Sequence, residues 1–293
     1  MHHDIQRTLL ADHATVALGR AQEALQQLEA AGESYLVAAA AGSEPVACDA
    51  LGRAGDAFAK AGQAQKAAEA FERQAAACRA QAPRALQRLG ELNEAGGNGA
   101  AAAAAYDRLD REYPASDEAR QSSGRLRALE PLLPPAAPAE RAARGLGRGL
   151  ALLEAGRNAD AARAFRGIPA DVLAREDADL ARVRGARALL ALGRLSETQA
   201  VLAAVKPDSP YAAEAAFYRA RVKARRGRST AGYEQVARQF PGTSWAEESL
   251  LALANEYQKD ALHDDALPHW RRLLAEHPDG RYEERACWRS AWA

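Results

Sequence analysis

Residue types that carry chemistry or cross-link chains are scarce in this sequence of 293 residues. Methionine occurs once, cysteine occurs three times, and aromatic residues make up only 6% of the chain. Lys and Arg together number 39 and so do Asp and Glu, which gives a formal net charge of zero. A chain with this balance has no bulk attraction for nucleic acid or an anionic membrane, and we expect neither as a partner.

Long apolar runs and catalytic motifs are also absent. Arg, Glu, Asp or Gln interrupts every alanine-rich stretch before it reaches the roughly 20 apolar residues of a membrane span. The N-terminus lacks the basic and apolar regions of an export signal. No phosphate loop, dinucleotide fingerprint, metal-ligand spacing or nucleophile elbow occurs. We therefore expect no catalytic residue, no cofactor, no metal site and no membrane span.

The three cysteines, Cys48, Cys78 and Cys287, match no metal-binding or redox spacing. An odd and unclustered set favours buried cysteines that act as small apolar residues. A Cys48–Cys78 disulfide is the alternative interpretation. Disulfides persist mainly in oxidising compartments. Because the spacing does not decide whether Cys48 and Cys78 are bonded, it does not assign a compartment.

Good helix formers dominate what is present. Ala, Leu, Arg, Glu and Gln are abundant, whereas the β-branched and aromatic residues typical of strands are sparse. Gly and Pro separate segments of about 12 to 18 residues, which is the rhythm of short antiparallel helices.

A repeat is visible where these segments end. Residues Tyr106–Pro114 align without gaps to Tyr233–Pro241 and to Trp270–Pro278. Aromatic and aliphatic residues three apart share a helix face, and the proline then ends the helix. The spacing along the chain from Pro207 to Pro241 equals one tetratricopeptide period.

Two sets of glycines mark the same repeat. The first set precedes a small residue by five positions and an aromatic residue by nine, as expected for the turn inside a hairpin: Gly62, Gly97 and Gly156. The second set lies where the first helix must let its partner approach: Gly55, Gly90 and Gly149. The sequence therefore predicts an all-α fold, an α-α superhelix (solenoid) of tetratricopeptide-like helical hairpins.

Prolines at 131, 134, 135 and 138 interrupt the helical pattern once. We predict a helical repeat block with capping helices over residues 1–129, a Pro-rich linker over 130–138 and a second repeat block over 139–293. The first 45 residues fit the repeat poorly, and we expect a long helix and a capping pair there. The second block reads as truncated at its end.

One basic stripe is the candidate binding site. Arg219, Lys223 and Arg226 follow helical spacing and should share a face. If that face lines the groove of the repeat, it could bind an acidic peptide, a phosphate or an anionic glycan. A solvated outer helix face is the alternative.

From Pro207 to its end the chain resembles the N-terminal superhelical domain of soluble lytic murein transglycosylases. The resemblance is carried by Phe240–Glu247, by Tyr257 and by Asp279–Trp292. It implies a helical scaffold that precedes a lysozyme-like domain, which cleaves peptidoglycan in the periplasm. That family's catalytic signature is Glu-Ser followed by Gly-Leu-Met-Gln, and the only methionine here is Met1, so no catalytic residue can be assigned.

The sequence thus leads to two functional hypotheses. The first is a non-catalytic scaffold of a lytic transglycosylase that positions a catalytic domain or holds peptidoglycan strands, with Trp288 and Trp292 facing the missing domain or a partner. The second is a free-standing tetratricopeptide adaptor that binds a peptide or protein in its concave groove. The first implies a periplasmic protein, and the second is compatible with the cytoplasm.

Overall fold

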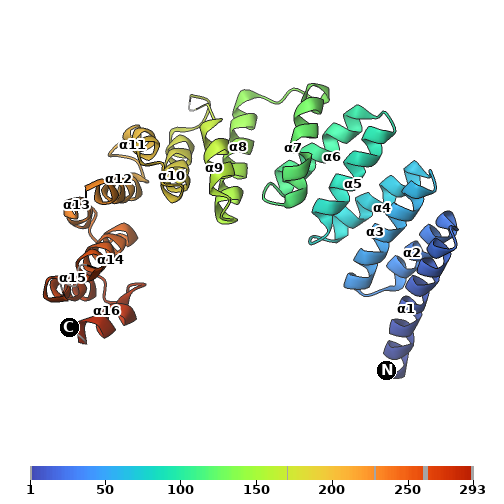
Figure 1. Ribbon diagram of the computed structural model, residues 1–293, viewed down its shortest axis with the longest axis horizontal. Coiled ribbons are helices and arrows are strands. Elements are labelled where there is room, and N and C mark those ends of the chain that lie inside the picture. The colour runs from blue at the N-terminus through green and yellow to red at the C-terminus, as the bar shows by residue number, and fades with distance from the viewer. Residues whose placement is uncertain (1, 170, 228, 260–262, 292–293) are drawn as a thin grey trace. The chain divides into compact units, whose positions relative to one another are not determined.

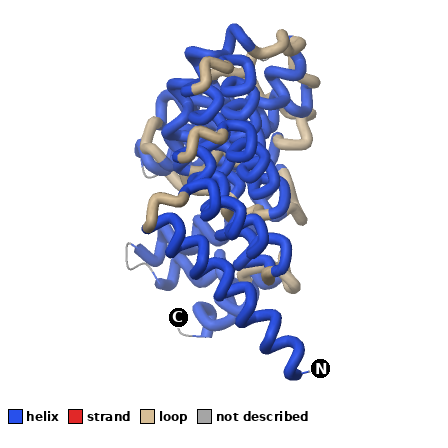
Figure 2. The backbone as a smooth tube through the Cα atoms, turned by 90° about the vertical axis from the view of Figure 1, so that its right-hand side faces the viewer, coloured by secondary structure: helices blue, strands red, loops and turns tan. Residues whose placement is uncertain are grey.

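The computed structural model describes the backbone of residues 2–169, 171–227, 229–259 and 263–291, and their side chains except those of residues 2–12, 259 and 263. The chain divides into two compact units, residues 1–136 and residues 137–293 (Figure 1). All regular secondary structure in these described ranges is helical (Figure 2). The predicted all-α solenoid class is confirmed.

Unit 1 is a series of antiparallel helices, each packed against its neighbour in the chain. A short 3₁₀ turn, Glu130–Leu132, follows the last of them. The helices are α1 (His2–Ala24), α2 (Leu28–Ala41), α3 (Glu44–Lys60), α4 (Ala64–Ala77), α5 (Ala82–Ala95), α6 (Gly99–Glu112) and α7 (Asp117–Leu129).

The first helix of unit 2 begins at Pro138, where proline occupies the first turn and therefore removes no intrahelical hydrogen bond. The helices of this unit also pair in sequence, and α10 packs in addition against the first helices of the hairpins on either side. The helices are α8 (Pro138–Glu154), α9 (Asn158–Arg166), α10 (Arg175–Ala191), α11 (Leu195–Ala203), α12 (Ala212–Gly227), α13 (Ala231–Gln239), α14 (Ser244–Lys259), α15 (His263–Glu276) and α16 (Glu283–Ala291).

An aromatic ring placed directly against a glycine holds the two helices of a hairpin together. A Cβ built on Gly90 would lie 2.3 Å from Cε1 of Tyr106, and Gly55 and Gly149 approach Phe71 and Phe165 in the same way. The spacing along the chain from glycine to ring is identical in all three pairs. Only a residue without a side chain permits this approach, so the predicted close-approach glycines are confirmed.

The same contact occurs at the start of the chain. A Cβ on Gly19 would lie 2.6 Å from Cε1 of Tyr35, and this pair has the same spacing as the later ones. The expectation that the first 45 residues fit the repeat poorly is therefore wrong at this hairpin, although α1 is long as expected. The register was hidden because Gly19 and Tyr35 lack the neighbouring proline and turn glycine that mark the later repeats.

Turn glycines and prolines define the helix ends. Gly62, Gly97 and Gly156 all have φ between +73° and +75°, a region that residues with a side chain rarely adopt. Pro114 and Pro241 each follow a helix that ends two residues earlier. These residues act as the repeat pattern predicts.

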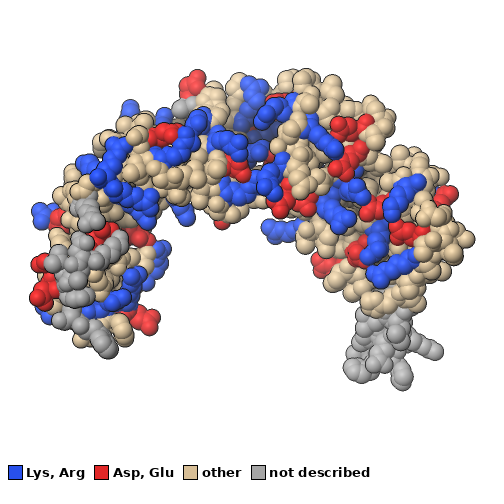
Figure 3. Space-filling model, in the orientation of Figure 1, with Lys and Arg blue, Asp and Glu red and all other residues tan. Residues whose placement is uncertain are grey.

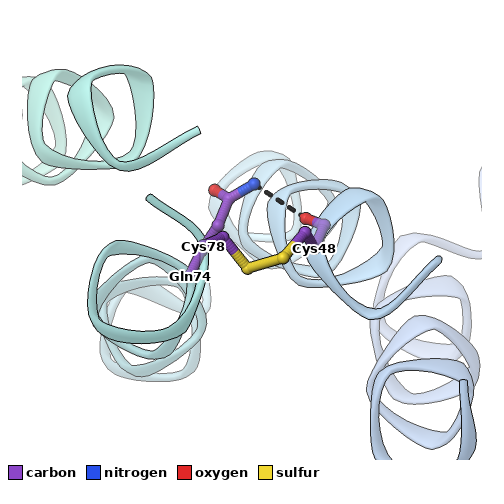
Figure 4. Close-up of a disulfide and its surroundings, with 3 residues drawn as sticks. All are labelled: Cys48, Gln74 and Cys78. Atoms are coloured by element: carbon purple, nitrogen blue, oxygen red, sulfur yellow. Dashed lines mark hydrogen bonds between the residues drawn. A yellow bond between two sulfur atoms is a disulfide. The ribbon is translucent and has the colours of Figure 1, made fainter. Parts of the chain in front are cut away.

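A disulfide joins Cys48 in α3 to Cys78 at the end of α4, with the two Cα atoms 5.6 Å apart (Figure 4). Both cysteines are buried as predicted, but the favoured interpretation as unbonded apolar residues is wrong. Gln74 Nε2 donates a hydrogen bond of 2.8 Å to the carbonyl oxygen of Cys48 beside the bridge. Cys287 is exposed and unbonded, so its predicted burial is also wrong.

Gly90→Ala should lower the free energy of unfolding by about 1–3 kcal/mol, because the new methyl group would overlap the Tyr106 ring. Gly124→Ala is the matched control, since the space around this exposed glycine of α7 is open. It should raise the free energy of unfolding by about 0.5–1 kcal/mol through helix propensity. Urea unfolding of the two variants measures both values, and equal effects would contradict the glycine–ring contact.

Candidate binding surfaces on the second unit

Arg219, the first residue of the predicted basic stripe, bonds to backbone carbonyls of the same unit. Its guanidinium reaches from α12 to the end of α11 and donates to the carbonyl oxygens of Leu202 and, at 3.0 Å, Val205. Burial lowers the pKa of Arg219. These carbonyls belong to a helix C-terminus, which a cation stabilises. Arg219 is thus a helix cap and lies beside α11.

The other two residues of the stripe are exposed on α12. Arg226 donates to Gln199 Oε1 at 2.8 Å and to Ser196 Oγ at 2.7 Å, both on α11. Lys223 makes no hydrogen bond or ion pair within the described part of the chain. The stripe does share one side of α12, as its spacing predicts, and that side is the one that meets α11.

Carboxylates are missing from α12 beyond its first turn and from the segment that follows it. Residues 215–233 contain six Lys or Arg and no Asp or Glu. Among the described residues, none of the five cations of α12 forms an ion pair: Arg219, Arg221, Lys223, Arg225 and Arg226. Their hydrogen bonds go to carbonyl, amide and hydroxyl oxygens, such as the 2.9 Å bond from Arg225 to the carbonyl of Leu190. On the face shown in Figure 3, Lys and Arg are dense over α10 to α12.

At the other end of α12 a buried carboxylate is paired. Glu214 is only 3% exposed and forms an ion pair with Arg184 of α10, which joins the first helices of two successive hairpins. Burial raises the pKa of Glu214, and this effect exceeds the opposing effect of Arg184. The neighbouring Tyr218 is also buried, and burial together with the charge of Glu214 raises its pKa to about 12.

Phe217 and Tyr218, which follow Glu214 on α12, belong to a cluster of aromatic rings. The Phe217 ring lies 5.8 Å from that of Tyr233 and 5.3 Å from that of Trp245, measured between centroids. Tyr218 meets the edge of Trp245 at 5.6 Å. Such tilted arrangements are favourable for aromatic pairs. The cluster joins α12, α13 and α14 and fixes the backbone from which the α12 cations project.

A cleft of about 220 Å³ lies between α9, α10 and α11. Its walls are apolar and include the half-exposed side chains of Ile168, Leu173 and Val201. Gly185 and a row of alanines on α10 form its floor. At the rim, Arg166 of α9 donates to Glu197 of α11 at 2.8 Å. This combination of an apolar interior and a charged rim is typical of a pocket that receives a side chain.

The predicted tryptophan contacts are only partly described. Trp288 on α16 is 58% exposed, and Arg289 lies over its ring at 5.9 Å. Trp292 lies outside the described residues. The structure therefore places one of these two rings at the surface, as the sequence suggests for a contact with another protein.

Metal-ligating residues do not gather in one place among the described side chains. No group of three or more His, Cys, Asp or Glu among them could hold a metal ion. None of the described helices is long and apolar enough to cross a membrane. Many surface carboxylates lie in ion pairs with arginine, for example Asp56 with Arg88 at 2.9 Å.

Sequence reasoning missed the cleft and the Glu214–Arg184 pair. The cleft lies where α9 ends at Arg166, and Ile168 and Leu173 of the segment before α10 form part of its wall. No sequence motif predicts this arrangement. Glu214 lies in the first turn of α12, and its burial and pairing depend on α10. Only the run of residues 215–233 without a carboxylate was readable in advance.

Comparison with known proteins places the chain near helical repeat proteins only by fold. No family model and no curated protein matches the sequence. Matching solved structures include the C-terminal part of a TPR repeat-containing protein from Cytophaga hutchinsonii, with 13% identity, coverage of 92% of this chain and 98% of that one, and a TM-score of 0.38. A tetratricopeptide repeat protein from Parabacteroides merdae matches with 14% identity, coverage of 96% and 98%, and a TM-score of 0.38.

A third match is the TPR2AB domain of yeast Sti1 in a complex with pHSP90. It has 17% identity, covers 96% of this chain and 97% of that one, and has a TM-score of 0.33. At such identities and scores, these matches carry no information about the ligand or partner of this chain.

Glu214→Gln should change the pH dependence of stability in a defined direction. Because the pKa of Glu214 is raised on folding, its contribution is fully present below the unfolded pKa and is lost as pH rises through the folded pKa. The parent should therefore gain stability relative to the variant as pH falls from about 7 to about 4. Urea unfolding across this range measures the difference, and the opposite slope would show that Arg184 dominates.

Proposed function

We propose that the chain is a non-catalytic scaffold that binds a protein or peptide partner through its second unit. The cleft between α9, α10 and α11 carries this proposal. Repeat proteins of stacked hairpins offer extended surfaces for binding, and a buried apolar anchor with a polar rim supplies most of the affinity of such contacts. A partner segment would place an apolar side chain against Ile168, Leu173 and Val201, with polar neighbours at the Arg166–Glu197 pair.

Selection of peptides from a random displayed library tests this proposal. We expect peptides that share an apolar anchor residue to be enriched on the purified chain. Ala200→Trp should weaken their binding about tenfold or more, because Ala200 lines the cleft and the indole would occupy it. Ala203→Trp is the matched control, since Ala203 is an exposed alanine of the same helix outside the cleft. Absence of enriched peptides, or equal binding to both variants, would contradict the proposal.

A second candidate function is that of a helical scaffold from a lytic murein transglycosylase. The resemblance of Phe240–Glu247 and Asp279–Trp292 to that family supports it. The Cys48–Cys78 disulfide also favours it, since structural disulfides form in the periplasm and are rare in the cytoplasm. Reading the gene downstream of codon 293 distinguishes the two functions. A Glu-Ser and a Gly-Leu-Met-Gln motif in the same frame would support a transglycosylase, whereas a free-standing adaptor would have neither.

We further propose that the protein works in an oxidising compartment, where the disulfide stabilises unit 1. The bridge closes a loop of 30 residues, so the oxidised protein should be more stable than the reduced one by about 3–4 kcal/mol. Urea unfolding with and without reductant measures this difference. A Cys48→Ala, Cys78→Ala double variant should not respond to reductant. If protein isolated from its native cells had free thiols at both Cys48 and Cys78, the proposed oxidising compartment would be refuted.

A further inference from the structure

Tyr35 of unit 1 takes part in a three-membered polar contact. Its hydroxyl donates to Glu23 Oε2 at 3.1 Å, and Lys60 Nζ donates to Glu23 Oε1 at 2.8 Å. The carboxylate lies 12 residues before the tyrosine on the first helix of the same hairpin, and the cation comes from the first helix of the next hairpin. A carboxylate thus sits between a hydroxyl and a cation.

Tyr106 repeats this contact in the same register. Its hydroxyl donates to Glu94 Oε2 at 3.1 Å, again 12 residues earlier in the chain. Arg125 of α7 donates to the Tyr106 hydroxyl at 3.1 Å and lies 3.7 Å from Glu94. The tyrosine–glutamate hydrogen bond therefore recurs in this repeat with a cation beside it, although here the hydroxyl is the group that bonds to both partners.

In unit 2 the same position holds a cation. Tyr233 of α13 packs on Phe217, which precedes it by the same spacing as Gly90 precedes Tyr106, so the register is preserved. The residue 12 positions before Tyr233 is Arg221, where unit 1 has glutamate. Arg221 is exposed, and no carboxylate of the described chain lies within ion-pair distance of it.

The charges around the Tyr233 hydroxyl are correspondingly different. Burial raises the pKa of Tyr233, and the nearby positive charges of Arg221 and Arg225 act against this rise. Glu256 of α14 is the one carboxylate that acts on the same hydroxyl within the described residues. Arg221 therefore stands at the position of α12 where the hairpins of Tyr35 and Tyr106 have a glutamate, and its charge acts on the Tyr233 hydroxyl.

We infer that this position binds a carboxylate of an acidic segment in the partner, with Arg221 as the main contact and Tyr233 as the neighbouring donor. The inference rests on the proposed function, because it names the chemistry of a partner that unit 2 binds. It also assigns the site to Arg221 instead of the predicted stripe, because Arg219 and Arg226 already bond to residues in and just after α11. Arg225 likewise bonds to the carbonyl of Leu190 and contributes only its charge.

Charge complementarity favours a peptide carboxylate over other anions. The chain itself shows twice that a glutamate side chain fits beside the tyrosine of this register together with a neighbouring cation. Arg225, one helical turn beyond Arg221, adds positive charge on the same side of α12. Inorganic phosphate is the competing small anion and serves as a comparison.

Fluorescence anisotropy with a labelled peptide of alternating glutamate and serine tests the inference. We expect binding that weakens with salt, no binding of the matching glutamine–serine peptide, and less than twofold competition by equimolar phosphate. Arg221→Gln should weaken binding about tenfold, since it removes a charge-assisted hydrogen bond. Glu256→Gln should strengthen binding about twofold, because it removes the carboxylate that competes for the site.

Arg238→Gln is the control for net charge. Arg238 is exposed on α13 and already pairs with Glu234, so its loss should change affinity less than twofold. Unchanged binding by Arg221→Gln, or equal losses in both variants, would overturn the inference, as would tight binding of the glutamine peptide. Peptides selected on the parent but lacking acidic residues would refute this site while leaving the proposed function intact. An absence of any selected peptide would refute the proposed function instead.

Discussion

The repeat depends on one contact, in which an aromatic ring of the second helix of a hairpin lies against a glycine of the first helix. The spacing along the chain from the glycine to the ring is the same each time. This contact lets two short helices approach closely enough to exclude water from the alanines around them. Tyr106 and Phe71 are almost fully buried in this way. A single hairpin cannot bury its apolar faces alone, so each ring stabilises its neighbours as well as its own pair. Where unit 2 replaces the glycine by Phe217, the ring pair becomes an aromatic cluster that includes Trp245.

Two units with the same hairpin plan differ in how their charges are arranged. In unit 1 carboxylates and cations pair between successive hairpins, as Asp56 does with Arg88. In unit 2 the cations of α12 meet carbonyl and hydroxyl oxygens, while Glu214 pairs with α10 at the other end of the helix. A helix whose positive charges find no carboxylate within its own fold remains available to a partner that supplies one.

Much of the helical layout could be predicted from sequence. The roles of Gly90 and Tyr106 could be predicted from their residue types and spacing. Only glycine lets the two helices approach so closely, and a large ring fills the space beside it. Gly62 and Gly156 likewise mark turns by a positive φ that other residues avoid. The role of Gly19 was missed because no proline or turn glycine accompanies it. The candidate site was predicted less well, since Arg219 has a basic side chain whose partner is a distant helix terminus.

The sequence by itself determined the helices and the hairpin register, since these depend on residue identities at short, fixed spacings along the chain. Tertiary structure alone decided three features. It brought Cys48 and Cys78 to disulfide distance, buried Glu214 beside Arg184, and left Arg221 without a carboxylate. Each depends on which residues of different helices meet in space, and spacing along the chain does not contain that information.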